Sequence, residues 1–543
     1  MNALGGVAFL LLAGIASGQE GESVRVNVRV SALGAGDTVS IDRGSGSQLE
    51  LNDLVVFRPL GGLPVEGVIE ELDDRSSVVR LYDQNLAMAV GTRGMVMVPG
   101  ERFIDPGADS AANQAPGQFS DDAWEDGMPL LAGIDAVHPA ERTPLFTGRT
   151  YFSLDQTWTS DNGRKDSFYR AGTDLTYENP FGEGGQLQFD AEYTYRSAHS
   201  GEGLSQDFTK LRFDRASYLW GGDRFNGERR EVGRFLLYGM PEFGVIDGFE
   251  YGTRRDNGDR YGYSLGFLPE PDGHFESGHD AQVSGFYEWH PEERDAMVVT
   301  VGFQRTFHSR TADRDLIVGK VSYQPRDGWD LHTTAWVDLY SGRDTEKPFI
   351  ELTHLLAVAN RNYGKEAGAT VSFRHWTFPQ LDRSEFLPVL DDQLANDHSE
   401  RLAYAGWKRL EGKRRLHGQV GVWLDDEDAG GDFEVGLEQR GFLRPSSRAD
   451  LTGYFSAGKF SYVAGLRAQY DWKATNGRWR VFYSVENQEQ EGFDQLDQLI
   501  QHWFRASRDY YTESGWSFNL RAETLLFGDE TSWSIGAYIQ RSF

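Results

Sequence analysis

The chain lacks cysteine, carries few basic residues for its length, and has no internal apolar run long enough to cross a membrane as a helix. The absence of cysteine excludes a disulfide scaffold, a thiolate metal site and a cysteine nucleophile. Lys and Arg number 54 against 83 Asp and Glu, a formal net charge of -29. Nucleic acid is therefore not an expected partner, because phosphate binding requires a basic face. A helical membrane protein is not expected either, since each span needs about 20 apolar residues.

Motifs for catalysis and cofactor binding are also scarce. The sequence has neither an H-E-x-x-H zinc motif nor a P-loop. Its 12 histidines are scattered, without the spacing of a Ser–His dyad or a metal pair. We expect no enzyme activity, no cofactor and no metal, although a site assembled from several strands would leave no local motif.

Aromatic residues are abundant, with 14 Trp, 23 Tyr and 34 Phe, which excludes a disordered chain. The first 18 residues are predicted to be a signal peptide, because the apolar stretch from Val7 to Ile15 is followed by the small residues Ala16, Ser17 and Gly18. The alternative is a buried N-terminal strand or helix. An exported chain without apolar helices would contact a membrane only through strands.

Residues 19–103 are predicted to form a small periplasmic β domain. Valines at 24, 26, 28 and 30 alternate with polar residues, as in a half-buried strand. Further short β runs are expected at 38–41, 53–57, 65–71, 77–82 and 94–98. Strands this short and close favour a small closed barrel. The segments VSIDRGSGSQLELNDLVVFRP, VEGVIEEL and SSVVRLY resemble SH3-like β-barrel modules of bacterial envelope proteins.

Residues 104–145 are rich in Pro, Gly, Ala and acidic residues, which predicts a flexible, self-repelling linker. Because the preceding domain is small and joined by such a linker, we expect it to hang in the periplasm and not to fill the barrel predicted below.

From residue 146 to residue 543 apolar and polar residues alternate in segment after segment. A soluble β-sandwich and a membrane β-barrel both produce this pattern. Many segments run ten or more residues, aromatics cluster at their ends, and the apolar faces contain many Ala and Thr; these features favour the membrane barrel. At roughly 18 residues per strand and connection, the region predicts about 22 antiparallel strands, within a range of about 18 to 24.

The chain ends in SWSIGAYIQRSF, which resembles the C-terminal strand of Gram-negative outer-membrane β-barrel proteins of the porin-like kind. The resemblance implies that Phe543 is an assembly signal read by the barrel assembly machinery. It also implies contact with the lipid bilayer and lipopolysaccharide. Oligomeric state is left open.

The alternation assigns a set of charged side chains to the lumen. A lumen lined by both signs of charge would stay wet and act on ions and small polar solutes; the alternative is that these charges only pair across neighbouring strands and stiffen the wall. The predicted lumen-facing charges are Arg170, Asp174, Asp190, Glu192, Arg196, Arg212, Asp214, Asp338, Arg467, Asp471, Arg480, Glu486, Arg521 and Glu523. The predicted aromatic girdle consists of Tyr193, Tyr195, Tyr470, Trp472, Trp516 and Trp533.

Two segments interrupt the alternation, and a third is notable for its clustered carboxylates. Residues 233–248 combine Pro241 with four glycines, which predicts a bent strand or an inward-folded loop. Residues 380–400 would form a long loop that constricts the pore, binds a partner or simply extends from the surface. The acidic turn 424–434 would suit Ca²⁺, but a solvated acidic loop is the favoured interpretation.

The leading functional hypothesis is a porin-like passive channel in the outer membrane. The alternative is a structural anchor or an export conduit, in which residues 20–103 bind a periplasmic protein.

Overall fold

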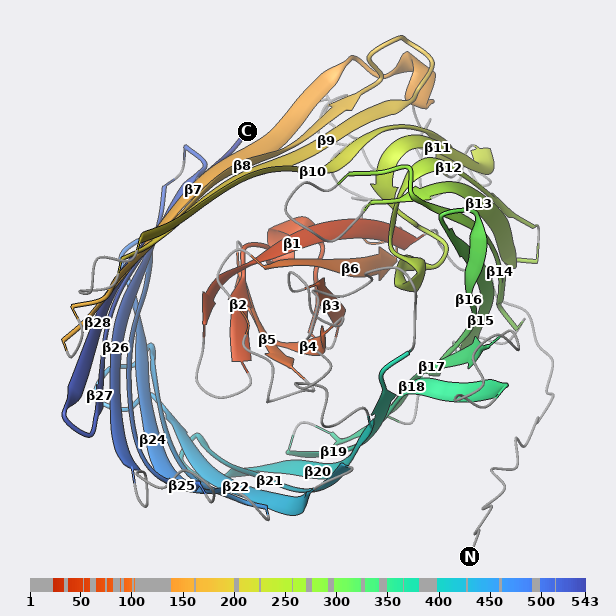
Figure 1. The fold of residues 1–543 in the computed structure, drawn as a ribbon. Helices are drawn as coiled ribbons and strands as arrows, with labels where there is room; N and C mark the ends of the chain where they lie inside the picture. The colour runs from red at the N-terminus through yellow and green to blue at the C-terminus, as the bar shows by residue number, and fades with distance from the viewer. Residues whose placement is uncertain are drawn as a thin grey trace, which may run out of the picture.

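The computed structural model consists of two closed β-barrels, one inside the other (Figure 1). Before residue 138 it describes residues 23–33, 38–51, 53–58, 65–73, 76–81, 88, 92–99 and 102. From residue 138 it describes the chain except 161–162, 200–204, 224–225, 256, 270–275, 292–296, 324–327, 341–348, 365, 380–397, 426–427, 459–460, 491–498 and 513. Among these residues no helix is long and apolar enough to span a bilayer. The predicted signal peptide and most of the predicted linker lie outside the described residues.

The inner barrel, residues 23–99, has six strands: β1 (Ser23–Leu33), β2 (Thr38–Ile41), β3 (Leu54–Arg58), β4 (Val65–Leu72), β5 (Ser77–Leu81) and β6 (Arg93–Pro99). They close in the order β1-β2-β5-β4-β3-β6. Every second side chain points inward, so that Val30, Ile41, Val55, Ile69 and Val79 form a fully buried apolar core. The prediction of a small closed barrel is confirmed.

The outer barrel has 22 antiparallel strands, as predicted. They are β7 (Leu145–Thr159), β8 (Lys165–Glu178), β9 (Gln186–His199), β10 (Ser205–Asp223), β11 (Asn226–Leu236), β12 (Val245–Arg254), β13 (Arg260–Leu268), β14 (Asp280–Trp289), β15 (Met297–His308), β16 (Thr311–Tyr323), β17 (Trp329–Leu339), β18 (Ile350–Tyr363), β19 (Ala367–Thr377), β20 (His398–Leu410), β21 (Arg414–Asp425), β22 (Ala429–Arg440), β23 (Ser447–Ala457), β24 (Ser461–Ala474), β25 (Gly477–Gln490), β26 (Leu499–Tyr511), β27 (Trp516–Phe527) and β28 (Glu530–Ser542). Each strand pairs with its sequence neighbours, and β28 pairs with β7 to close the wall.

The outer face of this wall is apolar. On β24, β27 and β28 the side chains of Leu466, Leu520 and Ile535 are each more than half exposed, at 55%, 58% and 54%. Side chains at odd separations from these along a strand point into the lumen, where Asp471 and Tyr538 are buried. An apolar exterior around a polar interior is the inverse of a soluble protein and suits a lipid surround.

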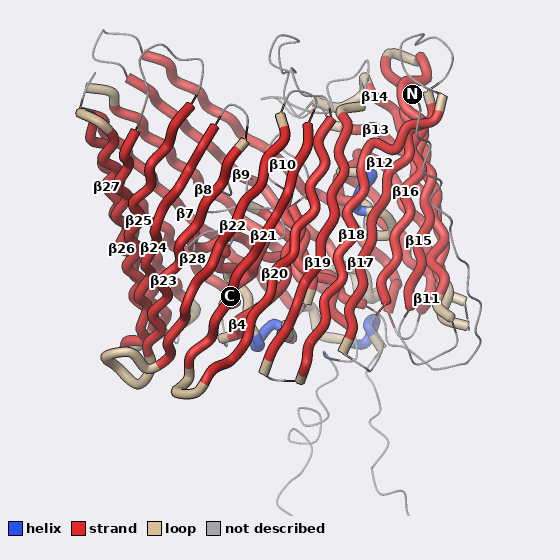
Figure 2. Tube along the Cα trace, turned by 90° about the horizontal axis from the view of Figure 1, so that it is seen from below, coloured by secondary structure: helices blue, strands red, loops and turns tan. Residues whose placement is uncertain are grey.

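The two ends of the outer barrel differ in their connections (Figure 2). At one end, here the turn end, short segments such as 475–476 and 411–413 join the strands. At the other, the loop end, connections reach the length of 378–397. The first and last strands both meet the turn end, where Phe543 exchanges two backbone hydrogen bonds of 2.9 Å with Gly148. In outer-membrane barrels the short turns face the periplasm.

Strand register places the predicted girdle residues near both ends. Tyr470, Trp472 and Trp516 lie beside connections of the turn end, where the rings of Trp472 and Trp479 stack at 6.0 Å. Tyr193, Tyr195 and Trp533 lie toward the loop end, and Trp533 is opposite Trp158 in the register. A girdle at each interface remains the interpretation of this arrangement.

If the outer face contacts lipid, Leu466→Arg will lower the free energy of unfolding of the protein in lipid vesicles by about 2–4 kcal/mol, the cost of an arginine near the bilayer midplane. Leu443→Arg, in the turn between β22 and β23 where the side chain is 80% exposed, is the matched control and should change little. Urea unfolding followed by tryptophan fluorescence measures both. Equal effects would contradict a lipid-facing wall.

Candidate functional site: the occupied lumen

The inner barrel lies within the lumen of the outer barrel (Figure 1). Several of its contacts are with wall residues near the turn end: Arg415 is the second residue of β21, Arg448 the second of β23 and Arg478 the second of β25. This corrects the expectation that the module hangs free in the periplasm. The composition of residues 104–145 carries no information about where the preceding domain lies.

On one side, arginines of the inner barrel meet carboxylates of the wall. Arg29, only 1% exposed, lies 3.1 Å from Asp190 and 3.6 Å from Glu192. Its guanidinium also donates a 3.0 Å hydrogen bond to the hydroxyl of Tyr151. Arg93 shares Asp190 at 3.1 Å. A buried arginine of this kind requires such partners, because an unpaired buried charge is very costly.

On the opposite side the signs are reversed. Glu71 pairs with Arg448 and lies 3.4 Å from Arg478. Asp73 lies 2.8 Å from Lys473 and 3.1 Å from Arg478. The inner barrel is thus held by charge pairs on two sides, and the arrangement of their signs fixes its orientation as well as its position.

Further ion pairs extend around the contact. Asp42 of the inner barrel pairs with the buried Arg149 of β7. Glu66 lies 3.1 Å from the imidazole of His332, and Glu70 lies 3.7 Å from Arg415.

Two glutamates of the inner barrel have lowered pKa values. Burial raises the pKa of Glu70, but Arg80 and Arg415 outweigh it and hold the pKa below the ordinary value of 4.5. The same balance lowers the pKa of Glu71, where Arg448 and Arg478 outweigh burial. Both carboxylates therefore stay charged in the docked position.

Among the predicted lumen-facing charges, some bind the inner barrel and others bind one another. Asp190, Glu192 and Asp214 contact the inner barrel. The remaining contacts join wall residues: Arg170 with Ser153, Asp174 with Arg149, Arg212 with Asp214, Asp338 with Arg314, Arg467 with Glu434, Asp471 with Arg448 and Arg478, Arg480 with Asp509, Glu486 with Tyr454, and Arg521 with Asp155 and Glu523. Arg196 is exposed. Cross-strand pairing, weighed as the alternative to a free charged lining, thus accounts for many of these residues. Glu434 and Asp432 of the acidic turn region pair with arginines in the same way.

Of the alternatives for residues 233–248, the structure shows an inward-folded loop, formed by residues 237–244. Between β11 and β12 a short 3₁₀ helix, η5 (Pro241–Phe243), places Met240 and Phe243 in an apolar cluster with Trp336 and Trp376 of the wall. The side-chain amide of Gln304 donates a 3.1 Å hydrogen bond to the carbonyl of Phe243. This loop fills part of the lumen, and its removal would expose apolar surface.

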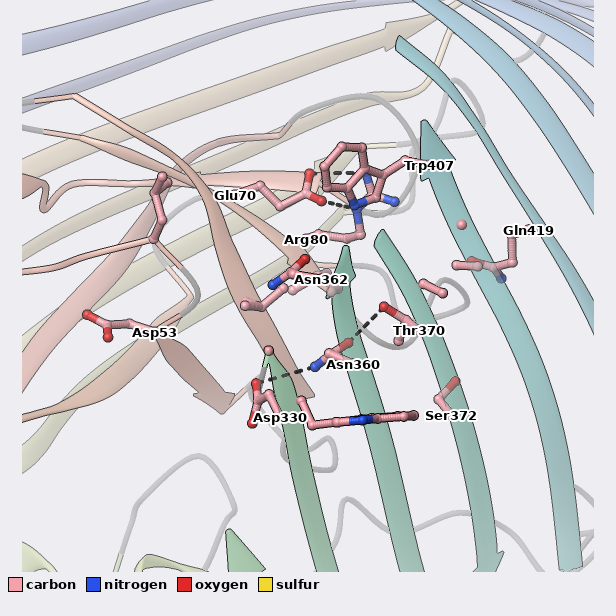
Figure 3. A pocket seen from close by; sticks show the side chains of 18 of the residues that line it. Asp53, Glu70, Arg80, Asp330, Asn360, Asn362, Thr370, Ser372, Trp407 and Gln419 are labelled. Atoms are coloured by element: carbon pink, nitrogen blue, oxygen red, sulfur yellow. Dashed lines mark hydrogen bonds and ion pairs between the residues drawn. The ribbon is translucent and has the colours of Figure 1, made fainter. Parts of the chain in front are cut away.

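A polar cavity of about 370 Å³ remains between the inner barrel and strands β17–β21 (Figure 3). Asp53, Glu70 and Arg80 line it from the inner barrel. The wall contributes Asp330, Asn360, Asn362, Thr370, Ser372, Trp407 and Gln419. Asn360 is fixed there by a hydrogen bond of 2.7 Å from the Thr370 hydroxyl. Amides, hydroxyls and carboxylates of this kind accept water and small polar solutes.

One segment of the sequence matches a motif of hydrolytic enzymes, but its structure differs from that of the motif. Residues 262–266 match G-x-S-x-G, the pattern that presents the nucleophile of α/β-hydrolases on a strand-to-helix turn. Here the pattern lies within the continuous strand β13, and the Ser264 hydroxyl forms a 2.6 Å hydrogen bond with Ser284. It therefore forms no nucleophile turn.

No protein-family model and no curated protein sequence matches the chain. Among solved structures, the translocation pore of the P pilus usher PapC is similar at 9% identity, with a TM-score of 0.43 over 74% of this chain and 100% of that chain. Pseudomonas aeruginosa OccK7 (OpdD) is similar at 10% identity, with a TM-score of 0.38 over 73% of this chain and 98% of that chain. Acinetobacter baumannii OccAB1 is similar at 9% identity, with a TM-score of 0.33 over 73% of this chain and 97% of that chain. At these scores the likeness supports no functional argument, and the strand pairing itself establishes the fold.

The ionic contact predicts that Glu71→Lys combined with Asp73→Lys will undock the inner barrel, because both lysines would face Arg448, Arg478 and Lys473. The inner barrel itself should stay folded, since neither residue belongs to its core. Spin labels on cysteines introduced at Ser47 and Thr475 report the distance between the barrels, which should lengthen and broaden. Glu50→Lys, whose carboxylate pairs with Arg102 inside the same module, is the control; a variant distance equal to the control's would contradict the ionic contact.

The lowered pKa of Glu71 predicts a dependence of docking on pH, because the arginines that lower it, Arg448 and Arg478, both lie on the wall. Glu70, by contrast, keeps Arg80 of its own barrel as a partner after undocking. If docking lowers the pKa of a carboxyl, that carboxyl stabilises the docked state. The stabilisation is complete at pH values above the pKa of the undocked state, and it is lost as the pH falls through the pKa of the docked state. Docking should therefore hold at pH 7 and weaken below about pH 4.5, the ordinary glutamate range. The same spin-label pair, followed from pH 7 to pH 3, measures this. Docking of the Glu71→Gln variant should be weaker at pH 7 and should respond less to acid. An unchanged acid response would assign the pH dependence to other groups.

Proposed function

We propose that the chain is an outer-membrane channel for ions or small polar solutes, and that the inner barrel is its movable plug. The outer barrel supplies the passage, with a charged inner face that suits hydrated solutes. The inner barrel closes this passage from the turn end. The proposal refines the porin-like hypothesis, since passage would require the plug to move or to rearrange.

The observation that carries the proposal is the nature of the contact between the barrels. The inner barrel closes its own sheet and buries its own apolar core. The wall is contacted through charged groups such as Glu71 and Asp73 on one side and Arg93 on the other. A module of this kind can leave its site without exposing a core, because charged groups are readily hydrated. A permanent filler would be expected to share apolar packing with the wall.

Placement in the outer membrane is supported by the apolar outer face and by the closed wall, since closed barrels are the only sheets that satisfy their backbone in lipid. An apolar exterior of this extent is rare on soluble monomers. The polar cavity beside β17–β21 marks the side on which a solute would first pass the plug.

A scaffold or export conduit is the second candidate. It is favoured by the position of the inner barrel, whose wall contacts lie near the turn end. A periplasmic protein would meet the inner barrel there, and such a partner would either use it as an anchor or withdraw it to open the conduit.

Planar-bilayer conductance tests the channel. The full chain should conduct little at neutral pH, whereas the chain without residues 23–99 should give large stepwise currents. A second variant addresses the risk that the deletion misfolds: Asp73→Cys with Lys473→Cys, bridged by a short bis-maleimide, locks the plug in a chain that has no other cysteine. The bridged protein should lose any openings that the undocking variant Glu71→Lys/Asp73→Lys gains. Silence of both the deletion and the undocking variant would reject the channel and favour the scaffold.

A further inference from the structure

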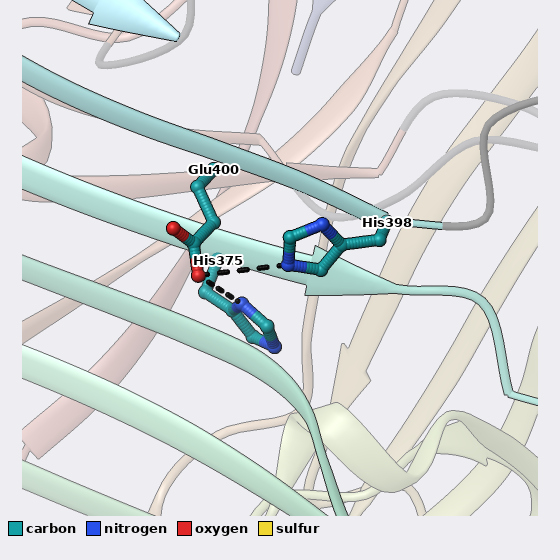
Figure 4. Close-up of side chains that lie close together, drawn as sticks. All are labelled: His375, His398 and Glu400. Carbon is teal, nitrogen blue, oxygen red and sulfur yellow. Dashed lines mark hydrogen bonds and ion pairs between the residues drawn. The ribbon is translucent and has the colours of Figure 1, made fainter. Parts of the chain in front are cut away.

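Two histidines and a glutamate converge on the outer barrel at its loop end (Figure 4). His375 lies near the end of β19, and His398 and Glu400 begin β20, on either side of the connection 378–397. In the register His375 is opposite Glu400, and Thr377 is opposite His398. The potential ligand atoms of the three side chains all lie within 4.8 Å of one another.

This cluster belongs to the outer face of the wall and is separate from the lumen. Side chains alternate along a strand, so His375 shares its face with Val371, which is 44% exposed. Glu400 shares its face with Leu402 and Tyr404, which are 49% and 52% exposed. The cluster therefore lies beyond the apolar band, at the rim, where water reaches it.

The hydrogen bonds of His375 indicate which of its two ring nitrogens carries the proton. Its Nε2 lies 2.8 Å from the backbone carbonyl of Leu352, which can only accept, so Nε2 carries the proton. In the neutral ring Nδ1 is then an acceptor, and it faces the carboxylate of Glu400 at 3.2 Å. His398 Nε2 faces the same oxygen at 3.5 Å. The Nδ1 of His375 and the carboxylate oxygen of Glu400 are both acceptors, so this contact needs a cation between them, either a second proton or a metal ion.

We propose that His375 Nδ1, His398 Nε2 and the Glu400 carboxylate bind a divalent transition-metal ion, with Zn²⁺ as the best match. Two imidazoles and one carboxylate are typical Zn²⁺ ligands, whereas Ca²⁺ and Mg²⁺ prefer oxygen alone. The Leu352 carbonyl plays the part that backbone carbonyls play beside metal-bound histidines, since it fixes the tautomer and orientation of the ring. Tetrahedral ligands at about 2.1 Å from the metal are about 3.4 Å apart, so the side chains need only a small closure.

With three protein ligands, the fourth tetrahedral position stays open to water. The ion would join the end of β19 to the start of β20 and so fix the base of the longest connection at the loop end. Sequence spacing gives no sign of the site, because this connection separates the two histidines and only the antiparallel register brings them together.

Isothermal titration of the chelator-treated, detergent-solubilised full chain with Zn²⁺ tests the proposal, and Co²⁺ absorption reports tetrahedral coordination. The wild-type protein should bind one ion. His398→Ala and Glu400→Gln should each weaken binding at least about tenfold, since even changes to residues that only orient a ligand cost this much. His308→Ala is the matched control, because this imidazole also lies at the loop end, 2.7 Å from Asp280.

The proposal would be overturned if the wild-type protein bound Zn²⁺ no more tightly than the two variants. Absence of any Zn²⁺ binding would also overturn it and would assign the cluster to a protonated His–Glu pair. All three residues lie on the outer face, so the variants should fold, and heat-modifiable migration on gels verifies this before titration.

Discussion

The charge-complementary contact between the two barrels is the interaction on which the rest of the structure depends. A closed sheet of 22 strands encloses a lumen too wide for its own side chains to fill. Its inward-facing charges must therefore be hydrated or paired. Neighbouring strands pair many of them, as Arg314 and Asp338 do, and the inner barrel pairs others, as Arg29 does with Asp190. The need to pair the inward-facing charges of the wall thus also accounts for the position of the inner barrel.

The fold could be predicted closely because its signals are local. A period of two along each strand, the length of the segments and the turn residues between them predicted 22 strands and the six strands of the small barrel. The same alternation assigned Asp471 and Tyr538 to one face and Leu466 and Ile535 to the other. Each of these inferences needs only residues that lie near one another in the chain.

The candidate site could not be predicted to the same extent, because its contacts join distant residues. Alternation indicates that Asp190 points inward, but not that Arg29, 161 residues earlier, will meet it. Likewise, no spacing rule connects Glu71 with Arg448, or His375 with His398. Local composition predicted a linker and a small domain. The position of that domain depends on surface charges whose pattern appears only after both barrels close.

Within the part of the chain that the structure describes, two elements obstruct the lumen, and the difference between them bears on how a passage would open. The loop with Met240 and Phe243 packs its apolar side chains against Trp336 and Trp376, so its withdrawal would transfer apolar surface to water. The inner barrel keeps its apolar residues inside and presents charges to the wall, so its withdrawal exchanges ion pairs for hydration. Such an exchange is close to balanced in free energy, because the desolvation of buried ion pairs offsets much of their attraction. The loop is therefore a fixed constriction, and the inner barrel is the element whose position a change in charge, pH or partner would shift.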